Sequence, residues 1–153
     1  MTGFAVAVAG HSEITKRILE GLIAERVNLV GVLGHEPKDA RNISAYTTMS
    51  SLASENGIDY VPYSNINARR SREAVAGWQT DVLLAVGLSQ IVKPTMLSVS
   101  RRCCIGFHST LLPEGRGRAP LAWLTLLARD GAANFFVMDD GVDSGDLIVS
   151  EPF

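Results

Sequence analysis

The sequence has little of what marks secreted, membrane-spanning or nucleic-acid-binding chains. Its two cysteines, Cys103 and Cys104, are sequence neighbours and cannot bridge to each other without strain. No apolar run approaches the length of a membrane span, which is about 20 residues. The net charge is −2, without the basic excess that binds a phosphate backbone. We therefore expect a cytoplasmic protein with reduced thiols that binds neither membranes nor nucleic acid.

Common metal and nucleotide motifs are also absent. The chain has no CxxC or HxxxH pair, no GxGxxG dinucleotide motif and no GxxxxGK[ST] phosphate loop. The turn Gly10, His11 and Ser12 could receive an anion at a helix N-terminus, but a tight connection capped by Ser12 explains the same residues. We favour the capped connection and expect no bound metal.

The composition that remains is typical of one globular domain. The chain has 153 residues, of which 46% are hydrophobic and 20% charged, and it contains no internal repeat or flexible linker. A chain of this length can bury roughly 70% of the surface that it exposes when unfolded. We expect a single domain over residues 1–153.

Short apolar runs alternate with helical patterns, which predicts an α/β fold with a doubly wound, mostly parallel sheet. Four buried strands are expected at residues 4–9, 29–33, 82–86 and 104–107, and the last strands of the sheet at 134–138 and 147–149. Apolar residues at helical spacing predict a first helix near residues 14–23. Further helices are expected at 47–55, 68–78, 93–97 and 121–129. Ligands bind such sheets beyond the carboxyl ends of the strands, so the residues after Val86, Phe107 and Met138 are the places to look for chemistry.

His108 follows the predicted strand 104–107 and begins a loop rich in glycine and arginine. Imidazole changes its charge near neutral pH, so it can donate to a developing oxyanion or move a proton. Arg116 and Arg118 in this loop could bind an anionic group or could hold the loop in place. His108 is therefore the first candidate catalytic residue.

A second loop concentrates carboxylates between residues 139 and 146. An ordinary polar turn explains them, while a calcium loop is disfavoured because the regular oxygen ladder and terminal Glu are missing. If Asp143 approaches His108, it could fix the imidazole tautomer and stabilise the charged ring.

The two loops together resemble the N-terminal catalytic domain of the folate-dependent formyltransferases, which include methionyl-tRNA, glycinamide ribonucleotide and amino-sugar formyltransferases. The residues that carry the resemblance are His108, Thr110, Leu111, Leu112, Pro113, Arg116, Gly117, Ala119 and Pro120, then Asp140, Gly141, Asp143, Gly145 and Asp146. It covers nearly the whole chain and implies a Rossmann-like formyltransferase fold. Family members usually continue beyond the point where Phe153 ends this chain, so the resemblance predicts a domain truncated at its C-terminus.

The resemblance also implies roles for single residues. His108 would stabilise the tetrahedral oxyanion, and Asp143 would orient and charge His108. The residues expected to bind the folate are Gly87, Leu88, Val137, Met138, Asp139 and Asp140, and those of the substrate loop are Ser109, Thr110, Pro113, Arg116, Gly117 and Arg118.

One catalytic position departs from the family pattern, because Gly106 stands where the family has Asn. That amide hydrogen-bonds the formyl group, and the loss of one such donor costs on the order of 10²–10³ in rate. If the missing donor limits the rate, Gly106→Asn should raise it. If the glycine is required by the backbone or by space, any side chain there should lower stability or block binding.

The expected function is an N-formyltransferase of one-carbon metabolism. Its formyl donor would be 10-formyltetrahydrofolate and its acceptor a small-molecule amine, such as a nucleotide-linked amino sugar, rather than tRNA, because the nucleic-acid-binding domain of the tRNA-specific members has no counterpart here. A formyltetrahydrofolate hydrolase and a folate- or nucleotide-binding module without catalysis are the alternatives. The sequence leaves the oligomeric state open.

Overall fold

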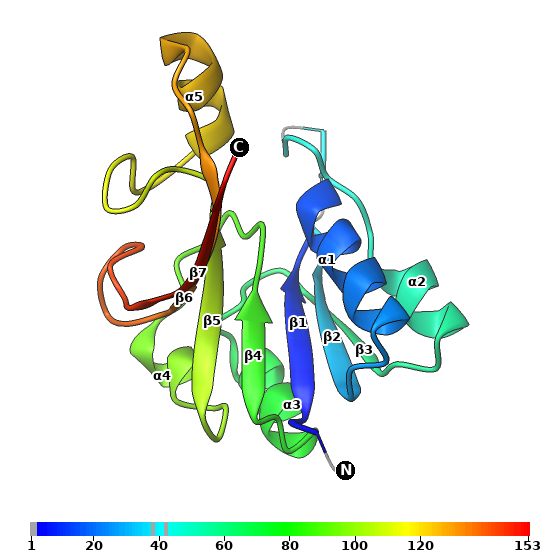
Figure 1. The fold of residues 1–153 in the computed structure, drawn as a ribbon. Helices are drawn as coiled ribbons and strands as arrows, with labels where there is room; N and C mark the ends of the chain where they lie inside the picture. Colours follow the sequence, from blue (N-terminus) through cyan, green and yellow to red (C-terminus); the bar gives the residue numbers. More distant parts are fainter. Residues whose placement is uncertain (1–2, 38, 42) are drawn as a thin grey trace.

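Figure 1 shows a computed structural model of the chain, which describes residues 3–37, 39–41 and 43–153. Seven strands form one sheet in the order β3-β2-β1-β4-β5-β6-β7. The strands are β1 (Val6–Gly10), β2 (Leu29–His35), β3 (Tyr60–Tyr63), β4 (Val82–Ala85), β5 (Cys103–His108), β6 (Ala132–Val137) and β7 (Leu147–Pro152). The helices are α1 (Glu13–Ala24), α2 (Ser50–Glu55), α3 (Arg69–Gly77), α4 (Pro94–Leu97) and α5 (Pro120–Leu127). The predicted α/β class and mostly parallel sheet are confirmed.

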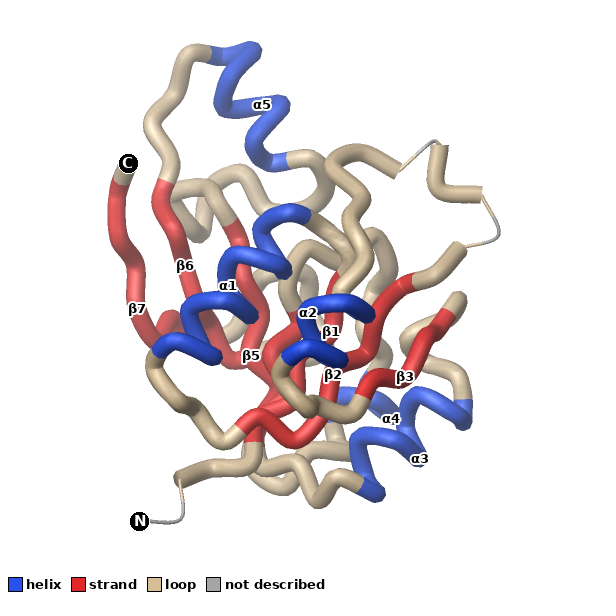
Figure 2. Tube along the Cα trace, turned by 90° about the vertical axis from the view of Figure 1, so that its right-hand side faces the viewer, coloured by secondary structure: helices blue, strands red, loops and turns tan. Residues whose placement is uncertain are grey.

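The core lies on both faces of the parallel strands. On one face, Leu19 of α1 and Ala53 of α2 pack against the sheet, and on the other face Val75 of α3 and Met96 of α4 do so. Figure 2 shows the sheet with α1 and α2 in front of it. The strand β1 lies between β2 and β4 and is buried along its whole length, because helices cover both of its faces.

The turn into α1 is the expected capped connection. The Ser12 hydroxyl accepts a hydrogen bond from the Thr15 backbone N–H, and the Thr15 hydroxyl accepts one from the Ser12 N–H, which forms a capping box. The Glu13 N–H donates to the carbonyl of Ala45. These protein groups occupy the helix N-terminus, so its geometry favours the structural interpretation over anion binding.

The structure corrects two features of the predicted sheet. β3 was missed because the strand is short and contains Pro62, which is tolerated at a sheet edge. β6 and β7 run antiparallel to their neighbours, with His108 opposite Asn134. Because β6 runs antiparallel to β5, the chain after Val137 leaves the sheet at the end of the strands opposite to His108. The expectation that Met138 stands at the same end of the strands as Val86 and Phe107 was therefore wrong.

The cysteines are free thiols, as expected. Cys104 is buried in the core, and burial raises the pKa of its thiol to about 12. Cys103 is half-buried at the start of β5. Of the helices in the described part of the chain, none has both the length and the apolar character to cross a membrane.

Candidate active site

His108 ends β5, and its side chain is 5% exposed. The distance from its Nδ1 to Oδ2 of Asp143 is 3.4 Å. Its Nε2 lies 2.9 Å from the carbonyl oxygen of Gly115. The structure therefore brings together the two candidate catalytic residues that the sequence singled out, and it surrounds the imidazole with acceptors.

Asp143 reaches His108 because the loop after β6 folds back along the sheet. The Asp143 backbone has a φ of 49°, in the left-handed region, and the Gly117 N–H donates to its Oδ2 at 2.9 Å. Gly145 allows the loop to pass close to the carbonyl of Val137, where a side chain would collide with the backbone. The same carboxylate oxygen thus contacts the imidazole and the substrate loop.

The two ring nitrogens of His108 both face acceptors. A neutral imidazole carries one N–H and one lone pair, so it would direct a lone pair at Gly115 or at Asp143. The doubly protonated ring can donate to both acceptors. An N–H of the ring can turn to an oxyanion once one of these acceptors withdraws.

Asn134 was missed by the sequence analysis. It lies opposite His108 on β6 and is completely buried, and its side-chain amide donates to the carbonyls of His108 and Ala132, each at 3.0 Å, and to that of Thr110. The amide thereby holds the backbone where β5 turns into the substrate loop. Nothing local distinguishes this asparagine from a surface residue, because its role depends on pairing across strands.

Phe136 fills the space beside Gly106. A Cβ added to Gly106 would lie 2.6 Å from Cζ of Phe136 and 3.1 Å from Cγ of Met138. A side chain at this position would therefore displace the aromatic ring. Asn134 does not replace the missing family amide, because its two N–H groups already face three carbonyls.

The predicted folate-binding residues lie on two loops. Leu88 follows β4 and Met138 follows β6, and both side chains pack half-buried against the core cluster that contains Cys104. Gly87 has a φ of +61° and approaches Ser12 so closely that a side chain would collide with the Ser12 hydroxyl. Val137 is the last residue of β6. Leu88 and Met138 thus provide apolar surface on one side of the sheet.

Asp139 and Asp140 are exposed at the start of the second loop. The Ser144 hydroxyl and the Gly141 N–H donate to Asp139, and these hydrogen bonds lower the pKa of its carboxyl group, with a smaller contribution from the charge of Arg116. Asp139 therefore closes the turn of its own loop.

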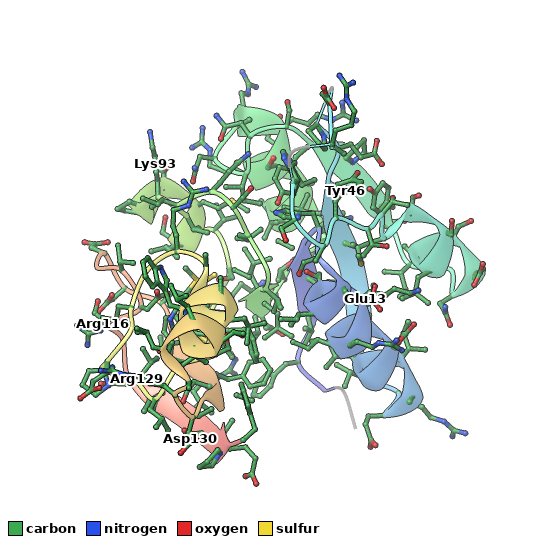
Figure 3. The ribbon with its side chains drawn as sticks, turned by 90° about the horizontal axis from the view of Figure 1, so that it is seen from above. Glu13, Tyr46, Lys93, Arg116, Arg129 and Asp130 are labelled. Carbon is green, nitrogen blue, oxygen red and sulfur yellow. The ribbon has the colours of Figure 1, made fainter. Side chains whose placement is uncertain are left out.

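The substrate loop borders a cavity of about 720 Å³. Ser109 and Thr110 are buried at its start, the Leu112–Pro113 peptide bond is cis, and Arg116, Gly117 and Arg118 follow. The residues that line the cavity are Thr110, Leu111, Glu114, Gly115, Arg116, Arg118, Trp123, Leu124, Leu127, Ala128, Arg129 and Asp130. Figure 3 views this edge of the sheet from above, with Arg116 and Arg129 on one side and Tyr46 on the other.

A second buried histidine lies at the same edge of the sheet. His11 follows β1 and is 4% exposed, and its ring is 5.3 Å from that of His35 and packs against Tyr46. Neither ring nitrogen has a hydrogen-bond partner among the described residues. Burial, and to a smaller extent the neighbouring His35, lowers the pKa of His11.

Comparisons with known proteins show the family of the chain and agree with its fold. A model of the formyl transferase family matches residues 3–152. The chain belongs to the formyl transferase family. A methionyl-tRNA formyltransferase of Agathobacter rectalis is 29% identical over 146 residues, which make up 94% of this chain and 47% of the relative. One from Clostridium novyi is 29% identical over 150 residues, or 95% and 48%. The chain spans about half the length of the curated relatives that it matches.

Solved structures of the family share the fold. The phosphoribosylglycinamide formyltransferase of Bacillus halodurans superposes with a TM-score of 0.78 at 16% identity, covering 97% of this chain and 79% of that protein. WlaRD, a sugar 3N-formyl transferase determined in the presence of dTDP and 5-N-formyl-THF, gives a TM-score of 0.68 at 17% identity. That match covers all of this chain and 53% of WlaRD.

Proposed function

We propose that the chain transfers a formyl group from 10-formyltetrahydrofolate to the amine of a small molecule, an amino sugar or a related metabolite. The contact between His108 and Asp143 carries the proposal, because it joins a proton donor to a carboxylate at the end of β5. Membership of the formyl transferase family supports the donor and the reaction type.

In the proposed reaction the amine nitrogen attacks the formyl carbon, and the bond between that carbon and N10 of the donor breaks. One proton moves from the amine to the departing nitrogen. His108 donates to the oxygen that gains negative charge, and Asp143 holds the imidazole in its orientation. Nε2 of His108 is hydrogen-bonded to the carbonyl oxygen of Gly115. This part of the substrate loop therefore withdraws when the formyl oxygen approaches Nε2.

The site for the folate ring is proposed on the loops after β4 and β6. Leu88, beyond the carboxyl end of β4, supplies apolar surface against which a planar ring system can pack, and Asp140 in the loop that brings Asp143 to His108 supplies a polar acceptor. Ala85 pairs with Gly106, so Leu88 follows β4 at about the level where His108 ends β5, and the formyl group would come near the imidazole.

The acceptor is proposed to occupy the cavity beside the substrate loop. Among the described residues, Arg116 and Arg118 form no ion pair, and the Trp123 side chain is 57% exposed. Free guanidinium groups suit an anion such as phosphate, and an exposed indole suits a flat ring. This combination favours an amino sugar that carries a nucleotide over a bare amine.

Binding without transfer is the second candidate function. The Phe136 ring occupies the space beside Gly106 that an amide side chain would need. A site that lost its formyl-binding donor could keep the folate surface at Leu88 while transferring slowly.

A product assay separates these functions. The chain is incubated with 10-formyltetrahydrofolate and one amine at a time, from free amino sugars to nucleotide-linked amino sugars, glycinamide ribonucleotide and methionyl-tRNA, and formylated amine and free formate are both measured. We expect formylated nucleotide-linked amino sugar. Formate without a formylated amine would instead indicate a hydrolase. Folate binding without either product would favour the binding module and contradict the transferase.

A further inference from the structure

Thr15 is a polar residue that is completely buried in the first turn of α1. Its hydroxyl donates to the carbonyl oxygen of Val86 at 2.8 Å and accepts a hydrogen bond from the Ser12 N–H at 3.1 Å. A hydroxyl group has a single donor hydrogen, so the bond to Val86 uses the one that Thr15 has. This buried bond joins the start of α1 to the end of β4, across 71 positions of sequence.

Val86 begins the loop that carries Leu88. It is the first residue after β4, and its N–H donates to the carbonyl of Ala9 at 2.9 Å. The last residue pair of the β1–β4 ladder is Ala9 with Ala85, so the carbonyl of Val86 lies beyond the ladder. The backbone of Val86 is thus held by β1 at its N–H and by the Thr15 side chain at its carbonyl.

The segments around this bond are in close contact. A Cβ added to Gly10 would collide with the Val86 carbonyl and with the Thr15 side chain. One added to Gly87 would collide with the Ser12 hydroxyl and would lie 2.9 Å from Oγ1 of Thr15. The two glycines therefore allow the backbones before α1 and after β4 to approach the Thr15 hydroxyl.

Gly87 by itself does not hold Leu88 in place. Its φ of +61° is readily adopted by glycine, but glycine adopts other backbone conformations about as readily. A change at Gly87 would move Leu88, whose side chain is half-buried against the core. The bond from Thr15 restrains the residue before Gly87. Without it, the buried carbonyl of Val86 would lose this donor, and the loop would gain by turning that carbonyl towards water.

We propose that Thr15 is a positioning residue for the candidate folate site, because its hydroxyl holds Val86 and thereby keeps Gly87 and Leu88 in the arrangement that receives the folate ring. The inference rests on the proposed function, since Leu88 belongs to the site proposed there. A loop that already has its bound arrangement loses less conformational freedom on binding, which increases the affinity. Thr15 acts through this loop and not on the reacting atoms.

Isothermal titration calorimetry of the whole chain with 5-formyltetrahydrofolate tests this role. Thr15→Val keeps the shape of the side chain but removes the hydroxyl, and it should raise the dissociation constant about 5–30-fold, because fewer molecules have the loop in its binding arrangement. Thr15→Ser keeps the hydroxyl and should bind nearly as tightly as the wild-type chain. A folded Thr15→Val variant with wild-type affinity would overturn the proposal.

Thr80→Val is the matched control. The Thr80 hydroxyl donates to the carbonyl of Val75 at 3.0 Å and its side chain is 1% exposed, but Thr80 precedes β4, at the end of the strand opposite to Leu88. Both valine variants should lower the free energy of unfolding, because each leaves a buried carbonyl without a donor. Only Thr15→Val should weaken folate binding. Equal losses of affinity in the two variants would contradict a specific role of Thr15.

The kinetics of transfer provide a second readout. Thr15→Val should raise KM for the formyl donor, while kcat at saturating donor stays within about threefold, because His108 and Asp143 keep their positions. A fall in kcat with an unchanged KM would contradict a role in positioning the folate loop.

Amide hydrogen exchange of the free protein separates this inference from the proposed function. Relative to the amides of β1, the Val86 amide should exchange about tenfold faster in Thr15→Val than in the wild-type chain, and Thr80→Val should not show this difference. A wild-type chain that binds no folate would contradict the proposed folate site, while faster exchange at Val86 would still show that Thr15 holds the loop. Unchanged exchange at Val86 in Thr15→Val would overturn the restraint itself.

Discussion

His11 and His108 lie at the same edge of one sheet, after β1 and at the end of β5, and both are almost fully buried. They differ in what faces their ring nitrogens. The ring of His11 packs against His35 and has no acceptor among the described residues, whereas that of His108 lies between a carboxylate and the carbonyl of Gly115. Burial lowers the pKa of His11, while the carboxylate beside His108 fixes the orientation of an imidazole that can donate a proton. The partner, and not the burial, therefore marks the candidate active site.

The same substitution at both histidines tests most sharply whether their roles differ. His108→Gln should lower the rate of formyl transfer by about 10²-fold or more, because the donor to the oxyanion is lost. His11→Gln should leave the rate within about threefold once it is corrected for the folded fraction. Single-turnover kinetics with 10-formyltetrahydrofolate and the amine that reacts best provide both rates. Similar losses in the two folded variants would remove the distinction.

Asp143 and Cys103 offer a second matched pair near β5. Asp143→Ala should reduce transfer severely, because His108 loses the carboxylate that orients its ring. Cys103→Ala removes a half-buried thiol at the start of the same strand and should leave the rate nearly unchanged. The measurement is kcat for each variant after its fold has been verified by circular dichroism. A Cys103 variant as slow as the Asp143 variant would contradict the assignment.

Substitution of Asn134 should lower the rate of transfer less than substitution of His108 or Asp143, because Asn134 only helps to position His108. Asn134→Ala leaves the buried carbonyls of His108 and Thr110 without their donor, which should lower the free energy of unfolding by about 1–3 kcal/mol. Transfer should fall by about tenfold in kcat, with KM little changed, because a shift of His108 affects the transition state most. Urea unfolding and steady-state kinetics measure the two effects. Loss of stability with an unchanged kcat would show that Asn134 supports the fold alone.

The family pattern suggested that Gly106→Asn could raise the rate by restoring a missing donor, but the packing around Gly106 predicts the opposite. Gly106→Asn should lower the free energy of unfolding by about 1–3 kcal/mol and give no gain in rate, because the new side chain collides with Phe136. Combining it with Phe136→Ala should cost less than the sum of the two changes. Denaturant titration of both single variants and the double variant completes the cycle. A stable Gly106→Asn variant with faster transfer would instead support the missing-donor explanation.

The pH dependence of stability should reveal the environment of His11. Its pKa is lowered in the folded chain, so below pH 6.5 the unfolded chain binds the proton more readily. The contribution to stability is complete above 6.5 and is lost as the pH falls through the folded pKa. The melting temperature should therefore fall more steeply with decreasing pH in the wild-type chain than in His11→Gln. Parallel curves for the two proteins would show that His11 does not titrate in this way.

The buried parallel strands were predictable because each is an apolar run long enough to cross a buried sheet, as in β1 and β4, whereas the short parallel edge strand β3 was not. The antiparallel direction of β6 was not predictable, because the direction of a strand depends on the strand with which it pairs and not on its local sequence. His108 and Asp143 could be paired through the family resemblance of their two loops. The contact of Phe136 with Gly106, and the clamp formed by Asn134, arise only when β6 pairs with β5.

Titration with 5-formyltetrahydrofolate, followed by amide NMR shifts of the whole chain, tests most directly whether the half of the sheet that bears His108 is the functional one. We predict that the largest shifts fall on Gly87, Leu88, His108 and Asp140, while His11 is unaffected. A folded chain with no shifts at saturating ligand, or one whose shifts cluster around His11, would contradict the location of the site.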